Sequence, residues 1–142
     1  MCRENIADLV HRYADAVVRR DEEVWASTWT PNATWELAPG WRAEGKDEIV
    51  ELWNRTMDGL AAVVQTVSNG TVELDEGGGT GTGRWYVNEY WQRTDGVRGM
   101  LLAHYDDHYA RLDGAWRFAR RALVVHYNGP ADLSGDFLDA RS

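Results

Sequence analysis

Cysteine, proline and long hydrophobic runs are scarce in this 142-residue sequence. The single Cys2 excludes an internal disulfide and a cysteine-rich zinc site. The longest apolar runs, such as residues 60–64 and 122–125, are too short to cross a bilayer, and no apolar signal region follows Met1. We therefore expect a cytoplasmic protein that does not insert into membranes.

Basic residues are also few, because 15 Lys and Arg stand against 23 Asp and Glu and give a formal net charge of -8. The acidic residues are scattered, so most of the surface would repel a nucleic-acid backbone or an anionic membrane. Hydrophobic residues make up 44% and charged residues 27%, which is typical of a folded globular domain. We expect one domain over residues 1–142, with its core in residues 6–127 and a polar tail over residues 129–142.

Tryptophan and tyrosine are abundant, with eight Trp and six Tyr beside only two Phe. Both residue types add a polar edge to a large apolar surface, which favours a pocket or an interface, although packing alone explains most single cases. We expect Trp29, Trp35 and Trp53 to line a pocket that binds a small, largely apolar molecule.

Hydrophobic periodicity divides the chain into a helical part and a stranded part. Apolar residues recur at helical spacing over residues 6–18 and 46–60, and Asp21 is placed to cap a short helix that ends before Pro31. Strands are predicted over residues 33–37, 63–74, 84–93, 97–112 and 115–127, with tight turns at 95–96 and 113–114 and a flexible connection at 77–83. This order is typical of an α+β fold with helices on one face of an antiparallel sheet.

The predicted strand over residues 100–112 carries the densest cluster of ionisable groups. Alternation places His104, Asp106 and His108 on one face, and Tyr105, Asp107 and Tyr109 on the other. Residues two apart on a strand lie about 7 Å apart, which is too far to share one metal ion without further ligands. We therefore expect no metal site.

We favour the face with Tyr105 and Asp107 as the one toward the pocket. A carboxyl on a concave, aromatic-lined face is poorly hydrated, which raises its pKa and suits acid or base catalysis near neutral pH. The alternative for Asp107 is a salt bridge to Arg121 or Arg111. Tyr13 either points its hydroxyl into a cavity or donates to a backbone carbonyl in the core.

Several short motifs keep a fixed order along residues 6–127. They are IADL at 6–9, RYA at 12–14 with Asp21, NATW at 32–35, GKDEI at 45–49, YDD at 105–107, and DGAWRF at 113–118 with Arg121. In this order and spacing they resemble the SnoaL-like members of the nuclear transport factor 2-like superfamily.

This resemblance implies a cone-shaped α+β barrel, in which a curved antiparallel sheet wraps around three N-terminal helices and leaves a deep pocket. Members are mostly dimers or trimers, and many are enzymes that move protons on apolar substrates without a cofactor. We therefore expect a homodimer or homotrimer and a cofactor-independent lyase or isomerase, of dehydratase or cyclase type. Its substrate would be a small, largely apolar cyclic molecule such as a polyketide, steroid or terpenoid. The alternative is a protein that binds such a molecule without chemistry.

The resemblance also carries single positions over to this chain. The dehydratase-like and dehydrochlorinase-like members use an Asp–His dyad, and its positions are occupied here by Val18 and Gln65. The arginine that lines the pocket of the dehydrochlorinase-like members matches Arg121. A reaction that needs the dyad is therefore not expected, and this favours the binding alternative.

Ketosteroid isomerase supplies a second comparison within the superfamily. Tyr13 matches its oxyanion-hole tyrosine, and Asp107 falls within one residue of its protonated aspartate. Its base has no counterpart, which leaves Glu89, His104 and His126 as open candidates for the base.

We therefore assign catalytic roles to Asp107, Tyr13, Tyr105 and Arg121. The residues expected to contact the substrate are Val18, Trp29, Trp35, Trp53, Met57, Gln65, Asn69, Tyr86 and His126.

Overall fold

The computed structural model describes residues 3–139, so Cys2 lies outside the described part of the chain. The elements in chain order are α1 (Arg3–Arg19), α2 (Glu22–Ser27), β1 (Trp29–Ala38), β2 (Trp41–Glu44), α3 (Lys46–Asp58), β3 (Leu60–Leu74), β4 (Thr80–Arg93), β5 (Arg98–Leu112) and β6 (Ala115–Gly129). None of the helices in the described residues is long and apolar enough to span a membrane.

The helices begin and end where local chemistry dictates. Asp21 caps α2, because its carboxylate accepts a hydrogen bond of 3.1 Å from the backbone N–H of Val24. Gly45 precedes α3 with a φ of 87°, a conformation that favours glycine. The third helix ends at Asp58, two residues earlier than predicted, because Leu60 already begins β3.

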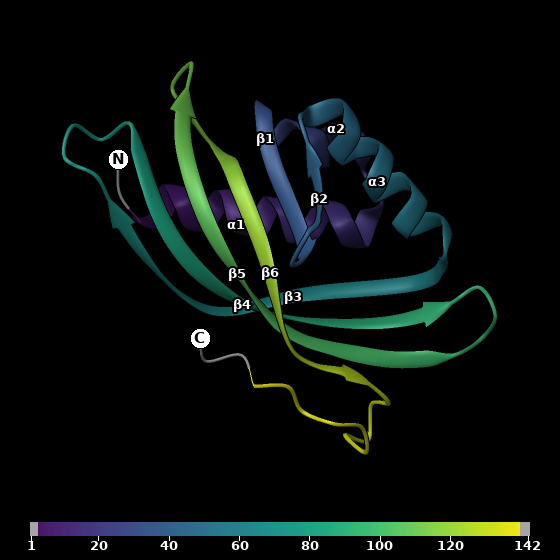
Figure 1. The fold of residues 1–142 in the computed structure, drawn as a ribbon. Coiled ribbons are helices and arrows are strands. Elements are labelled where there is room, and N and C mark those ends of the chain that lie inside the picture. Colours follow the sequence, from purple (N-terminus) through teal and green to yellow (C-terminus); the bar gives the residue numbers. More distant parts are fainter. Residues whose placement is uncertain (1–2, 140–142) are drawn as a thin grey trace.

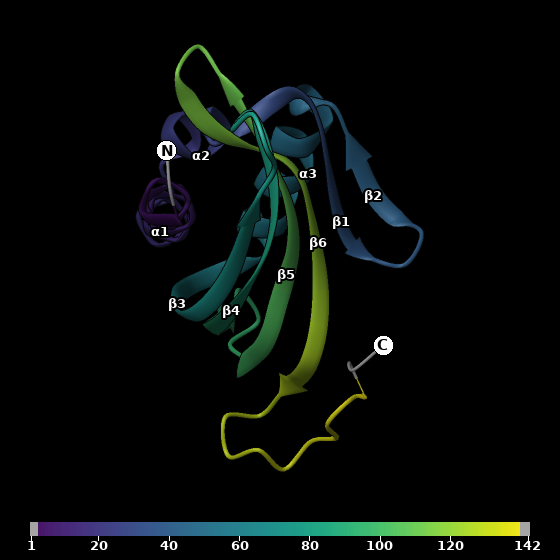
Figure 2. The ribbon, with the colours of Figure 1, turned by 90° about the vertical axis from the view of Figure 1, so that its left-hand side faces the viewer.

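The six strands form one strongly curved sheet in the order β2-β1-β6-β5-β4-β3. All neighbours are antiparallel except β1 and β6, which are parallel. Figure 1 shows α1 lying in the hollow of the sheet, and Figure 2 shows the helices together on one side of it. The expected α+β fold with a curved sheet around helices is confirmed, but the sheet stays open and contains one parallel pair.

Two segments are more regular than the sequence predicted. The first strand begins at Trp29 and continues through Pro31, because a shift in the β1–β6 register between Trp29 and Thr34 leaves no ladder bond for the proline to break. The glycine run at 77–83 is only partly a connection, since β4 already begins at Thr80.

A cluster of aromatic side chains fills the space between the helices and the sheet. Trp25 stacks on Trp53 with ring centroids 4.7 Å apart, and Trp29 packs against Trp25 at 5.6 Å. Tyr13 adds its ring edge-on to Trp29. Beyond β6, Phe137 forms a β-bridge with Tyr127, so part of the expected tail packs back on the sheet.

Candidate functional site

A cavity of about 390 Å³ opens between α1, α3 and the concave face of the sheet. Its walls are mainly apolar, with Val17, Leu101 and Leu123 as examples. The polar side chains that line it are Tyr13, Thr56, Gln65, Glu89, Tyr105 and Asn128. This size and lining suit a small organic molecule.

Tyr13 and Tyr105 bring two phenol groups together at the cavity wall. Their hydroxyl oxygens are 3.5 Å apart, and the indole N–H of Trp35 donates to Tyr105 at 3.4 Å. Burial raises the pKa of both phenols above the ordinary value, so they are neutral donors at neutral pH. A ligand oxygen placed here would meet two hydrogen-bond donors.

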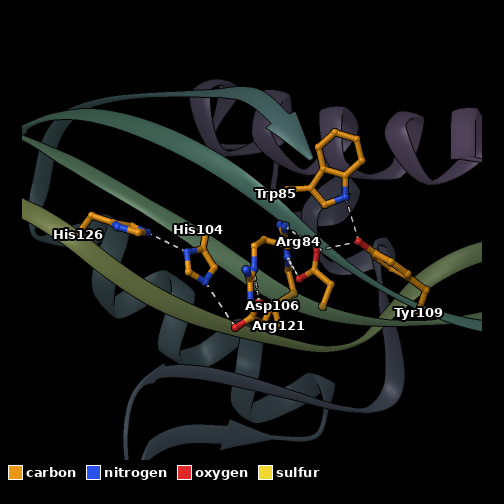
Figure 3. A network of polar contacts seen from close by, with 8 residues as sticks. Arg84, Trp85, His104, Asp106, Tyr109, Arg121 and His126 are labelled. Carbon is orange, nitrogen blue, oxygen red and sulfur yellow. Dashed lines mark hydrogen bonds and ion pairs between the residues drawn. The ribbon is translucent and has the colours of Figure 1, made fainter. Parts of the chain in front are cut away.

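A buried cation lies directly behind these phenols. The guanidinium carbon of Arg121 is 3.9 Å from the ring centroid of Tyr105 and 4.6 Å from that of Tyr13. Its charge is balanced by Asp107, whose two carboxylate oxygens accept hydrogen bonds of 2.7 and 3.0 Å from Arg121. Tyr109 also donates to Asp107. Trp85 donates to Tyr109, as the dashed line between these two residues in Figure 3 shows.

The two charges of this ion pair shift each other's pKa. Burial raises the pKa of Asp107, and the charge of Arg121 opposes that shift. Burial also opposes the charge of Arg121, but the carboxylate of Asp107 offsets it and the pKa of the guanidinium is raised. Arg121 therefore stays cationic.

Asp107 does not occupy the place that the sequence predicted for it. It lies on the concave side of β5, but it is 2% exposed and does not line the cavity. The alternative interpretation, a salt bridge to Arg121, describes what the structure shows. The reason is the register of β5 and β6, which places the two residues directly opposite each other.

Gln65 and Glu89 form a second polar pair in the cavity. They are cross-strand partners on β3 and β4, and the side-chain N–H of Gln65 donates to the Glu89 carboxylate at 3.1 Å. Burial raises the pKa of Glu89, and this hydrogen bond opposes the shift. Glu89 was one of three candidates for the base in the sequence. It lies two residues after Val87 and four after Trp85 on β4, and this alternation indicates that it faces the concave side of the sheet.

Five of the residues expected to contact the substrate lie outside the cavity. Val18 is 40% exposed on α1, where its neighbour Val17 lines the cavity instead, and Trp29 is fully buried in the aromatic cluster. Asn69, Tyr86 and His126 line a shallow depression on the outer face of the sheet. The remaining four, Trp35, Trp53, Met57 and Gln65, do line the cavity.

A register shift explains why Asn69 does not face the cavity, and strand alternation explains it for His126. His126 directly follows Val125, which lines the cavity, so alternation turns its side chain to the other face of β6. The register of β3 shifts between Val67 and Gly70. One extra residue in a strand reverses the alternation of all residues that follow it. Asn69 therefore loses the inward orientation that it would share with Gln65.

The outer face carries its own polar network, shown in Figure 3. Nε2 of His126 lies 2.8 Å from Nδ1 of His104, and Nε2 of His104 lies 3.5 Å from a carboxylate oxygen of Asp106. Arg84 donates to Asp106 at 3.0 Å. Burial lowers the pKa of His104. Because these residues lie across the sheet from the cavity, neither histidine serves as its base. Among residues 3–139, no three His, Cys, Asp or Glu side chains are grouped to hold a metal ion.

Helices packed in the hollow of a curved sheet, with a cavity between them, define the nuclear transport factor 2-like fold. A model of the SnoaL-like domain matches residues 2–122, and the chain therefore belongs to the SnoaL-like family. No protein of curated function matches the sequence.

Solved structures with the same fold cover nearly the whole chain. A candidate scytalone dehydratase from Novosphingobium aromaticivorans is similar with a TM-score of 0.85 and 18% identity over 98% of this chain and 93% of the other. The hexachlorocyclohexane dehydrochlorinase LinA is similar with a TM-score of 0.83 and 25% identity over 96% and 92%. Its type-3 form from Novosphingobium barchaimii has a TM-score of 0.82 and 22% identity over 96% and 92%.

Proposed function

We propose that this protein is a cofactor-independent acid/base enzyme, a lyase or isomerase of dehydratase or cyclase type. Its substrate is a small, largely apolar cyclic molecule such as a polyketide, steroid or terpenoid. The observation that carries the proposal is the pair of phenol hydroxyls at the cavity wall, backed by the buried cation of Arg121. Such an arrangement stabilises negative charge on a substrate oxygen.

The roles of the polar residues follow from their positions. Tyr13 and Tyr105 donate to an oxygen that becomes an enolate or alkoxide during the reaction. Arg121 favours that charge from behind the two rings, and Asp107 keeps the guanidinium in place through its paired hydrogen bonds. Asp107 is then a positioning residue, and the proton is transferred by another group.

The cavity and the relatives both support an apolar substrate and an elimination. A volume of about 390 Å³ with apolar walls accommodates a molecule of two or three fused rings. Among the similar structures, a candidate dehydratase and two dehydrochlorinases carry names that denote eliminations. These names support a lyase, while the choice of substrate rests on the cavity alone.

The alternative is a protein that binds the same class of molecule without reacting with it. Val18 and Gln65 stand where the resemblance places the Asp–His dyad, and this observation favours the alternative. Trp35 and Trp53 line the cavity, so their fluorescence should report binding in either case.

Turnover assays on aromatic polyketides, steroid ketones and cyclic terpenoids separate the two functions. The enzyme proposal predicts conversion of at least one compound without added metal or cofactor. Binding at micromolar concentration, seen as quenching of tryptophan fluorescence, with no conversion of any bound compound would favour the binding protein. We further propose a homodimer or homotrimer, which light scattering on the purified protein would test.

A further inference from the structure

Glu89 is the only carboxyl group among the described residues that line the cavity, and no histidine lines it. It lies on β4, on the same face as Val87, which is also part of the cavity wall. The side chain is only partly buried, so a ligand in the cavity can reach it. A group that takes up and returns a proton must be accessible in this way, and the fully buried Asp107 is not.

Gln65 is suited to hold Glu89 in both of its protonation states. The amide N–H now donates to the carboxylate at 3.1 Å, and after rotation of the amide its oxygen would accept from the carboxylic acid. The amide oxygen, Oε1, is buried and has no hydrogen-bond partner among the described residues. A buried acceptor without a partner is costly, and the hydroxyl of protonated Glu89 would satisfy it after that rotation.

The electrostatics of the cavity connect Glu89 with the phenols. Burial raises the pKa of Tyr105, while Arg121 and the hydrogen bonds with Tyr13 and Trp35 lower it, and the charge of Glu89 adds a smaller effect that raises it. The same cavity therefore holds a carboxyl whose pKa is raised by burial and two hydrogen-bond donors backed by a cation. This is the combination that proton abstraction next to a carbonyl requires.

We propose that Glu89 is the proton-transfer residue of this cavity and that Gln65 positions it. The inference rests on the proposed function. The carboxylate takes a proton from the carbon beside a substrate carbonyl, and the electrons of the broken C–H bond form the C=C bond of an enolate. The carbonyl oxygen takes up the negative charge beside Tyr13 and Tyr105. In a β,γ-unsaturated ketone the enolate is conjugated, so Glu89 can return the proton to the γ-carbon as the electrons shift to re-form the carbonyl, which isomerises the substrate. In a β-hydroxy ketone the enolate collapses to the conjugated enone, the C–O bond breaks, and Glu89 protonates the departing hydroxyl, which leaves as water.

Hydrogen–deuterium exchange on β-tetralone, a bicyclic ketone, tests this step without knowledge of the natural substrate. In D₂O the wild-type protein should accelerate the replacement by deuterium of the protons on the carbons beside the carbonyl. Proton NMR measures the rate at which the signal of these protons disappears. Glu89→Gln should slow the protein-catalysed exchange by about 10²- to 10⁴-fold. Glu89→Asp should retain part of the rate, because it keeps a carboxyl. Glu73→Gln, which changes an exposed carboxyl on β3, is the matched control and should exchange as the wild type does.

Binding and pH dependence separate a proton-transfer role from a structural one. The Kd of β-naphthol, measured by tryptophan fluorescence, should change less than about threefold in Glu89→Gln. The exchange rate of the wild type should rise with pH around the raised pKa of Glu89, and this step should be absent in Glu89→Gln.

The outcomes distinguish the inference from the function on which it rests. Wild-type rates in Glu89→Gln would overturn the role of Glu89 and leave the proposed function in place. If Glu89→Gln weakened β-naphthol binding by the same factor by which it slowed exchange, Glu89 would have a structural role and its role in proton transfer would be overturned. Binding of β-tetralone to the wild type without any acceleration of exchange would overturn both proposals.

Discussion

Asp107 and Arg121 hold each other through two hydrogen bonds, of 2.7 and 3.0 Å, where neither side chain has any exposed surface. The pair lies behind the phenols of the cavity and fixes the guanidinium against the ring of Tyr105. A buried ion pair of this kind contributes little net stability against apolar residues of equal size, but removal of one partner leaves an unpaired buried charge.

Asp107→Asn should therefore lower the free energy of unfolding by about 3 kcal/mol, because Arg121 keeps its charge. Urea denaturation measures the change. Replacement of both residues, Asp107→Leu with Arg121→Met, should cost less than the single change. Asp95→Asn, at an exposed ion pair, is the control and should leave the midpoint almost unchanged. A double variant less stable than Asp107→Asn would contradict this account.

The stability of the protein should depend on the protonation of Glu89. Burial raises its folded-state pKa above the ordinary value near 4.5, so the folded state holds the proton more tightly than the unfolded state does. Protonated Glu89 contributes to the free energy of unfolding. This contribution is fully present below the ordinary pKa and is lost as the pH rises through the folded-state pKa. Wild-type stability should thus fall relative to Glu89→Gln between pH 4 and neutral pH, as measured by urea denaturation at each pH. If the free energy of unfolding of the two proteins had the same dependence on pH, the raised pKa of Glu89 would be contradicted.

Tyr105→Phe should slow the exchange of β-tetralone about 10²-fold, because it removes a donor to the developing negative charge. The ring and its contact with Arg121 remain, so any fall in the melting temperature should reflect only the lost hydrogen bonds with Trp35 and Tyr13. Tyr90→Phe alters a half-exposed tyrosine outside the cavity and should exchange as the wild type does. Equal rates in the two variants would remove Tyr105 from the mechanism.

Gly83→Ala should destabilise the protein by roughly 2 kcal/mol. A Cβ at this position would overlap the hydroxyl of Tyr109, which donates to Asp107, and would approach the carbonyl of Thr71 to 2.8 Å. Gly79→Ala is the matched control, because its Cβ would have nothing within 4 Å. Thermal unfolding of both variants tests the difference, and equal melting temperatures would show that Tyr109 moves aside at no cost.

Most of the fold could be predicted because local patterns determine it. The apolar stripes of α1 and α3 follow the helical period, and alternation along β5 is enough to place Tyr105 on one face and His104 on the other. The short strand β2 was missed, since its four residues give too few repeats for a period to show.

The candidate site was harder to predict, because it depends on how strands pair. The sequence does not state that Gln65 lies opposite Glu89, or Asp107 opposite Arg121, since register is a property of two strands together. Tyr86 was predicted inward, although its neighbours Trp85 and Val87 take the concave face. A shift of one residue in the strand register decides whether a side chain faces the cavity or the outer surface of the sheet.

Strand β6 comes last among the strands of residues 3–139, yet it lies in the interior of the sheet, between β1 and β5, as Figure 1 shows. Because the ribosome makes the chain from its N-terminus, β1 has no partner on that side until β6 has been synthesised. The aromatic cluster around Trp25 and Trp53 therefore lacks a complete sheet until residues 115–129 have been synthesised. The nascent chain should therefore need chaperones during synthesis, and a product truncated before residue 115 should be cleared by proteases rather than persist as a smaller folded protein.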